Sequence, residues 1–288
     1  MKKRSLLLVA LSTLPLLITG CDSKKKDSLL KKEIPVQLEA SLSSEKTYYD
    51  LSFQYDDNYF LEDANKYNKN LSLLSFGCSI VSKNVQTGNA FFDKASFTDI
   101  DAKNYQQSSK DNCAYMLAHK NIQDFEVVAV AFRGFDYQVE WANNLEIGNS
   151  GDHEGFAKCL SSVYTELQSY ISAHCSNKTL KLWINGYSRG GALSNLLASN
   201  IIKDKKIDVS QSNVFVYTFE APRGVYKDNA SKYENVHNIV NSCDLITNIA
   251  SPCPNTSLNN PSVGLGKASR LKKGVSVTFQ SFSVRMGR

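Results

Sequence analysis

The stretch Leu-Trp-Ile-Asn-Gly-Tyr-Ser-Arg-Gly-Gly-Ala-Leu, residues 182–193, decides the fold. An apolar strand leads into Gly186-Tyr187-Ser188-Arg189-Gly190, and an apolar helix follows at once. A G-x-S-x-G motif between a strand and a helix is typical of a nucleophile elbow, whose sharp turn exposes the serine above a sheet. The alternative is an ordinary strand–turn–helix that uses glycine for its turn.

The chemistry of this turn depends on its two glycines and on the helix after it. Gly186 and Gly190 flank Ser188 at i−2 and i+2, where a tight turn leaves no room for side chains. The N–H groups and the positive dipole end of the following helix favour a developing oxyanion. The pattern therefore predicts Ser188 as a nucleophile for acyl transfer.

Four apolar runs predict buried parallel strands, at residues 127–132, 180–184, 214–219 and 236–240. Between the first two, residues 156–171 carry apolar side chains at steps of three and four, which predicts a helix. A second helix follows the elbow, and residues 59–82 are predicted as further helix. Alternating strands and helices indicate an α/β fold with a mostly parallel sheet and helices on both faces.

The N-terminus has the pattern of a bacterial lipoprotein signal. A basic start at Lys2, Lys3 and Arg4 precedes the apolar residues 6–18, which are too few to span a bilayer. The sequence Ile-Thr-Gly-Cys at 18–21 resembles a lipobox, which implies cleavage before Cys21 and lipid attachment to its thiol. The alternative is an ordinary secretory signal with a chance cysteine.

This pattern predicts three segments and a compartment. They are a signal peptide at 1–20, lipidated Cys21 with a polar tether at 21–46, and one α/β domain at 47–288. The protein is expected outside the cytoplasm, anchored to a bacterial membrane by lipid without crossing it.

The positive charge of the chain lies at its two ends. Residues 1–46 carry nine Lys/Arg against five Asp/Glu, residues 47–244 carry 18 against 23, and residues 245–288 carry six against none. A nucleic-acid binder concentrates basic charge on its folded body, so no nucleic-acid partner is expected. The basic C-terminal stretch is either solvated or in contact with anionic lipid headgroups.

The cysteines suggest disulfides rather than metal. Six remain besides Cys21, with no C-x-x-C and no cysteine–histidine spacing typical of zinc. An even number permits disulfides outside the cytoplasm, and Cys243–Cys253 is the most plausible local pair among fifteen possible pairings. No metal or organic cofactor is expected.

Several short motifs around the elbow resemble the class 3, or fungal-type, lipase family. In chain order they are Arg133-Gly134, Trp141, His153-x-Gly155-Phe156, the Ser188 elbow, Phe219-x-x-Pro222-Arg223, and the strand ending at Asp244. The resemblance covers about residues 125–250. It implies an α/β-hydrolase fold and hydrolysis of acylglycerols or other carboxylic esters, and it looks closest to bacterial lipase-like proteins.

Roles carry over from that resemblance residue by residue. Ser188 is the nucleophile, Asp244 orients the catalytic histidine, and the backbone N–H groups of Arg189 and Phe135 form the oxyanion hole. Phe135 replaces the usual Thr or Ser, so one hydroxyl donor is lost. Arg189 replaces a smaller apolar residue and is expected either to meet acidic substrate groups or to fill the pocket mouth.

The pattern breaks at the general base, because a catalytic histidine is expected after Asp244 and the sequence has none there. Three interpretations stay open: a chain shortened relative to its relatives, substitution by another histidine such as His153 or His237, or a serine pocket used only for binding. The first functional hypothesis is a lipid-anchored serine lipase or esterase. The second is a lipase-fold lipoprotein that binds an acyl ligand or partner. A solute-binding lipoprotein is a weaker third.

Overall fold

A computed structural model describes residues 29–41, 46–106, 109, 111–134, 144, 146–148, 151–176, 178–225 and 232–240. Its centre is a six-stranded sheet in the order β3-β4-β5-β6-β7-β8. The strands are β3 (Thr98–Lys103), β4 (Tyr115–Ile122), β5 (Phe125–Phe132), β6 (Thr179–Tyr187), β7 (Val214–Phe219) and β8 (Val236–Ile239). The pairs from β5 to β8 are parallel, and β3–β4 and β4–β5 are antiparallel. The four predicted strands and their parallel arrangement are confirmed.

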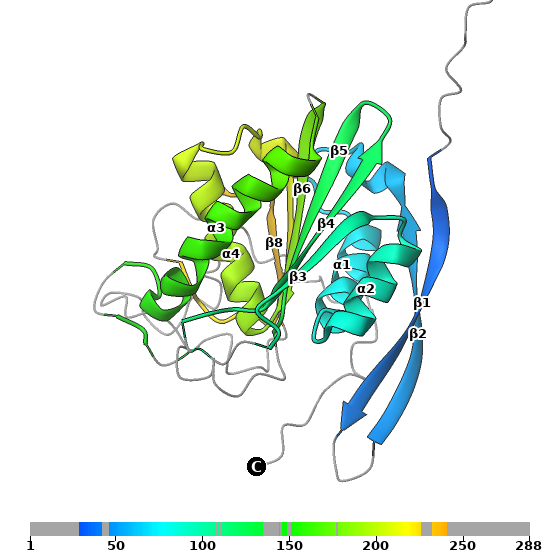
Figure 1. The fold of residues 1–288 in the computed structure, drawn as a ribbon, viewed down its shortest axis with the longest axis horizontal. Helices are drawn as coiled ribbons and strands as arrows, with labels where there is room; N and C mark the ends of the chain where they lie inside the picture. Colours follow the sequence, from blue (N-terminus) through cyan, green and yellow to red (C-terminus); the bar gives the residue numbers. More distant parts are fainter. Residues whose placement is uncertain are drawn as a thin grey trace, which may run out of the picture.

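Helices cover both faces of this sheet, as Figure 1 shows. The helices α3 (Glu154–His174) and α4 (Arg189–Asp204) lie on one face, and α1 (Lys69–Val81) and α2 (Val85–Lys94) lie on the other. Successive strand residues point to opposite faces, so each strand contributes to two cores. In β5, Val128 and Val130 pack on the α3–α4 side, and Val127 and Ala129 pack on the α1–α2 side. This two-sided burial confirms the predicted α/β fold class.

The apolar stripe of α3 is buried as its spacing predicts. Phe156, Leu160, Val163 and Leu167 belong to the core under α3 and α4, and Ile171 packs against its edge. The chain forms a helix here because the stripe repeats at three- and four-residue steps, so it faces the sheet along one side. Its first turn is capped by His153, which becomes important at the site.

The region predicted as one helix at 59–82 is divided. Residues Asp57–Phe60 form the 3-10 turn η1, and α1 begins only at Lys69. Asn68 sets that start, because its side-chain oxygen accepts the N–H groups of Asn70 and Leu71 in a helix N-cap. The helix α2 and the strands β3 and β4 were not predicted.

Part of the expected tether is paired strand. Residues Lys31–Ser41 form β1, which pairs antiparallel with β2 (Lys46–Asp56) and runs along the outside of α1 and α2 (Figure 1). Ile34 is fully buried in the core on that side, while its neighbours Glu33 and Pro35 are exposed. The alternation of apolar and polar residues is the local signal of a half-buried strand. It corrects the expectation of unpaired polar sequence for residues 31–41.

The signal peptide, Cys21 and residues 241–288 lie outside the described residues. Within the described ranges, no helix combines the length and hydropathy needed to cross a bilayer.

Candidate active site

Ser188 stands at the junction of β6 and α4, at the carboxyl end of the parallel strands. Its backbone has φ 51° and ψ −123°, a conformation that residues other than glycine rarely adopt. The Ser188 N–H donates to the carbonyl of Phe219 at 2.7 Å, and its own carbonyl accepts the N–H groups of Gly191 and Ala192. These bonds hold the serine in a sharp turn between strand and helix, with its side chain partly exposed.

The glycines of the motif are required by close backbone contacts. A Cβ on Gly186 would lie 2.3 Å from the carbonyl carbon and oxygen of Gly190. A Cβ on Gly190 would lie 2.7 Å from the carbonyl oxygen of Phe132, at the end of β5. Real Cβ atoms do not approach other atoms this closely. The predicted reason for glycine at both positions, absence of room, is therefore confirmed.

The loop after β5 touches the elbow directly. Gly134 lies so close to it that a Cβ there would be 1.9 Å from the carbonyl oxygen of Tyr187. The Arg133 N–H donates to the carbonyl of Ala114, which fixes the start of this loop. Phe135, the residue expected to give the second oxyanion donor, follows Gly134 and lies outside the described residues.

The Arg189 side chain does not lie at a pocket mouth. It is 1% exposed, and one terminal nitrogen, Nη2, lies 3.3 Å from both the Asn112 carbonyl oxygen and the Cys159 Sγ. Its guanidinium carbon lies 6.0 Å from the centre of the Phe156 ring. Both expected roles of this side chain are wrong, because it is packed into the interior beneath α3. Its backbone N–H is in the first turn of α4, where helix N–H groups lack an intrahelical acceptor.

A buried polar network joins the elbow helix to the strand that leads toward Asp244. The Asn238 side-chain oxygen in β8 accepts from Asn195 Nδ2 at 2.8 Å and from Thr218 Oγ1 at 2.5 Å. The Glu220 N–H donates to the Ile239 carbonyl at 2.9 Å. The ends of β7 and β8 are thus tied beside Ser188. Asp244 lies four residues past the last described residue, Val240, so its predicted role stays a prediction.

His153 is a helix cap in this structure. Its Nδ1 accepts the N–H of Phe156 at 3.4 Å. Its Nε2 lies 3.3 Å from the Asn144 carbonyl oxygen, and it donates a hydrogen bond to that oxygen when it carries the proton. The ring stacks on Phe156 at 3.8 Å between centroids. Burial is the main cause that lowers its pKa below the usual 6.5, so the ring is neutral at neutral pH. Both ring nitrogens are occupied in holding the start of α3.

His237 is also packed into the protein. Its Nε2 lies 3.0 Å from the Ala64 carbonyl oxygen, and its ring contacts Tyr67 and Tyr217. Burial lowers its pKa below 6.5. Neither this histidine nor His153 is placed by these contacts as a partner of Ser188.

The remaining histidines contact acidic residues at the other end of the sheet. His119 Nδ1 and His174 Nδ1 each lie 3.6 Å from a carboxylate oxygen of Asp99, which is a residue of β3. Among the described cysteines, Cys78 and Cys175 are free thiols. The predicted Cys243–Cys253 pair lies outside the described residues.

Comparison with known proteins shows that one family model matches part of the chain. The model of the class 3 lipases matches residues 128–253, which contain the last five residues of β5, the elbow and β8. The predicted resemblance is confirmed over that range. None of the curated proteins matches the chain.

Several solved structures are similar to part of the chain. One is a fungal lipase in an inhibitor complex, which is 16% identical over 63% of this chain and 74% of that one, with a TM-score of 0.47. Another is a triacylglycerol lipase whose catalytic centre is a serine protease triad; it is 19% identical over 63% of this chain and 74% of that one, with a TM-score of 0.46. The mono- and diacylglycerol lipase of Aspergillus oryzae is similar at 15% identity over 63% of this chain and 74% of that one, with a TM-score of 0.45.

Proposed function

We propose that this chain is a serine hydrolase of the class 3 lipase type, which cleaves ester bonds of lipids through an acyl-enzyme on Ser188. The observation that carries the proposal is the backbone of Ser188, which has a positive φ between β6 and α4, next to two glycines at which a Cβ would contact backbone atoms. Strain of this kind persists only where surrounding structure enforces it, and it concentrates at active sites. The match of residues 128–253 to class 3 lipases supports the same assignment.

In the proposed reaction, Ser188 Oγ attacks the ester carbonyl carbon and the alcohol leaves, forming an ester with the serine. Water then hydrolyses this acyl-enzyme and releases the carboxylic acid. The Arg189 N–H, at the first turn of α4, is one proposed donor to the oxyanion, and the Phe135 N–H is the second. We propose that Asp244, beyond the end of β8, orients the base.

None of the described histidines is placed to act as the general base that this mechanism needs at Ser188. The nitrogens of His153 serve the Phe156 N–H and the Asn144 carbonyl, and His237 Nε2 is directed to the Ala64 carbonyl. A serine hydroxyl without a base is a weak nucleophile. This observation favours a second candidate function, in which the elbow and its pocket bind an acyl ligand without turnover.

The proposed location is the outer face of a bacterial cytoplasmic or outer membrane, with lipid on Cys21 as the anchor. Such an anchor would bring the domain to a surface that contains ester substrates. The mass of the mature protein tests it, because lipidation adds acyl chains to a chain that begins at Cys21.

Activity-based labelling separates the two functions. The full chain is purified and incubated with a fluorophosphonate probe, beside Ser188→Ala and the matched control Ser199→Ala. Ser199 lies on the same helix, where its hydroxyl contacts the Tyr233 hydroxyl at 3.3 Å. If Ser188 is activated, wild type and Ser199→Ala are labelled and Ser188→Ala is not.

Absence of labelling in wild type, with a cooperative unfolding transition, would contradict the hydrolase proposal. Displacement of a fluorescent long-chain fatty acid by unlabelled fatty acid would then support the binding function. If labelling occurs, a variant of each histidine in turn shows which one supplies the base.

A further inference from the structure

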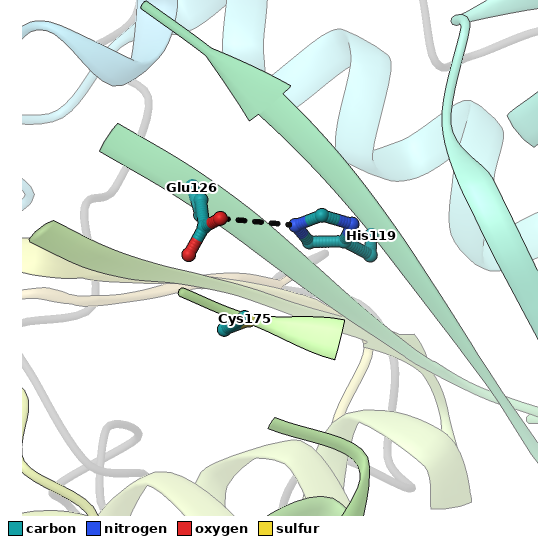
Figure 2. A group of neighbouring side chains, drawn as sticks. All are labelled: His119, Glu126 and Cys175. Carbon is teal, nitrogen blue, oxygen red and sulfur yellow. Dashed lines mark ion pairs between the residues drawn. The ribbon is translucent and has the colours of Figure 1, made fainter. Parts of the chain in front are cut away.

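Three potential metal ligands meet at the end of the sheet opposite Ser188. His119 comes from β4, Glu126 from the start of β5, and Cys175 from the C-cap of α3, just before β6 (Figure 2). One imidazole nitrogen, one carboxylate oxygen and one sulfur all lie within 4.8 Å of one another. The residues are separated by up to 56 positions in the chain, so no local sequence motif connects them.

The His119 ring nitrogen that faces this cluster has no hydrogen-bond partner in the part of the chain that the structure describes. The side chain is 9% exposed, and its Nε2 has no hydrogen bond. Nε2 lies 3.8 Å from Glu126 Oε1, which is too long for a hydrogen bond. A buried polar atom left without a partner costs about 1–3 kcal/mol of desolvation, so this nitrogen requires an explanation.

The other ring nitrogen of His119 is directed at a carboxylate. Nδ1 lies 3.6 Å from Asp99 Oδ2, beside the cluster but not part of it. Histidines that bind metals usually direct their second nitrogen to a carboxylate or carbonyl, which fixes the ring orientation and the tautomer. With its proton on Nδ1, His119 presents the Nε2 lone pair to Glu126 and Cys175.

The Glu126 carboxylate is held in place by the residue after Cys175. Oε2 accepts the Ser176 N–H at 2.9 Å, and Oε1 accepts the Ser176 hydroxyl at 3.0 Å. The side chain of Glu126 is almost fully buried, while Cys175 is partly exposed and carries a free thiol. A solvent ion therefore reaches the cluster from the side of Cys175.

We propose that His119 Nε2, the Glu126 carboxylate and the Cys175 sulfur bind one divalent transition-metal ion, with Zn²⁺ as the best fit. Zinc binds histidine nitrogen and cysteine sulfur at about 2.0–2.3 Å in tetrahedral geometry. The ligand atoms are then about 3.3–3.8 Å apart, so the cluster contracts by up to about 1 Å around the ion. Thiolate and imidazole ligands exclude Ca²⁺ and Mg²⁺, which prefer oxygen.

The charges balance on binding. The Cys175 thiol releases its proton to solvent, and the resulting thiolate and the Glu126 carboxylate neutralise the two charges of the ion. Water occupies the fourth position, because three protein ligands leave one open. The ion clamps β4 and β5 to the connection between α3 and β6. It lies at the opposite end of β6 from Ser188, so it is independent of the proposed hydrolysis.

The alternative is a metal-free cluster in which a protonated His119 pairs with Asp99 and Glu126. Cys175 separates the two interpretations, since only the metal site needs its sulfur. Cobalt substitution reports sulfur ligation directly, because thiolate bound to Co²⁺ gives a charge-transfer absorption and a tetrahedral site gives intense visible bands.

The test uses the full chain, stripped of metal with a chelator and titrated with Co²⁺ and then Zn²⁺. Wild type is compared with Cys175→Ala, His119→Gln and the conservative variant Cys175→His. One control is Cys78→Ala, which removes a thiol buried in α1. Another is Cys243→Ala/Cys253→Ala, which removes the cysteines near the C-terminus.

The proposal expects one equivalent of Co²⁺ with a charge-transfer band that Zn²⁺ displaces, in wild type and in both controls. Cys175→Ala should lose the band and at least about tenfold in affinity, while Cys175→His should lose the band and retain Zn²⁺. At a hundredfold excess over Kd, Zn²⁺ should raise the wild-type Tm by about 5–10 °C. Absence of the band in wild type, or an equal band in Cys175→Ala, would overturn the proposal.

Discussion

Replacing Gly186 with alanine tests whether backbone contact sets the geometry of the elbow. The added Cβ would lie 2.3 Å from the carbonyl group of Gly190 and 2.8 Å from the Gly191 nitrogen. All of these atoms belong to the backbone of α4, so no side-chain rotation relieves the contact. Overpacking costs typically about 1–3 kcal/mol and occasionally more, and we expect the upper end of that range here.

Two further glycines provide a graded comparison. Gly190→Ala meets the Phe132 carbonyl oxygen at 2.7 Å and should cost somewhat less than Gly186→Ala. Gly224→Ala meets Phe156 and Ala192 atoms only at 3.2–3.4 Å, and should cost about 1 kcal/mol or less. For a domain of this size, about 3 kcal/mol lowers the Tm by about 6–12 °C. The order is measured by thermal and urea unfolding.

The same variants give a second readout at Ser188. To bring the Gly186 contact from 2.3 Å to an ordinary separation, the β6–α4 junction must open by about 1 Å. A displacement of that size lowers the rate of a positioned reaction by about 10²-fold, so fluorophosphonate labelling of Gly186→Ala should fall accordingly. If Gly186→Ala were as stable as Gly224→Ala and labelled at the wild-type rate, the argument from backbone contact would be refuted.

Three other predictions concern strain, the first strand and a buried histidine. Ser188→Gly should raise stability by about 1 kcal/mol, because glycine tolerates φ 51° without strain; a lower urea midpoint than wild type would show that the serine is not strained. Ile34→Ala should lower the unfolding free energy by about 2–5 kcal/mol, since Ile34 is fully buried. Tyr48→Ala on the same hairpin should change it by no more than about 0.5 kcal/mol, because Tyr48 is 53% exposed. Equal urea midpoints for the two variants would mean that β1 does not pack on the core. Burial holds the pKa of His153 below 6.5, so below about pH 6.5 the unfolded chain binds a proton that the folded chain does not. The unfolding free energy should therefore fall as the pH drops below about 6.5, by at most about 1.4 kcal/mol per pH unit for this group. His153→Asn keeps a capping oxygen and removes this titration, so its unfolding free energy should depend less steeply on pH; an unchanged slope between about pH 5 and 7 would contradict the assignment.

The parallel half of the fold could be predicted because its signals are local. Each strand from β5 to β8 is a short apolar run, α3 repeats its apolar residues at helical spacing, and Gly186 and Gly190 report a tight turn within five residues. Periodicity and turn chemistry act over a few residues, so they can be read directly along the chain. The sharp turn at Ser188 was predicted for the same reason, and the structure shows that turn with a positive φ at the serine.

The antiparallel additions needed the tertiary structure. The alternation of β1 around Ile34 is present in the sequence, but polar neighbours and a basic N-terminal context made it resemble a tether. Strand β4 carries His119 and Lys120, which are buried only because other segments supply partners. Lys120, for example, lies 2.7 Å from Asp57 and 2.9 Å from the Tyr55 hydroxyl. A charged residue is expected to be exposed when only the sequence is known, because burial requires a partner that the sequence does not show.

The candidate site residues show the same division between local sequence signals and tertiary packing. The sequence by itself determined the sharp turn at Ser188 and the parallel sheet that presents it, because turn geometry and hydrophobic spacing are properties of neighbouring residues. Only the tertiary structure decided that His153 caps a helix, that Arg189 packs inward, and that His119, Glu126 and Cys175 meet. These outcomes depend on which distant segments pack together, and the protonation and contacts of a polar side chain follow from that packing.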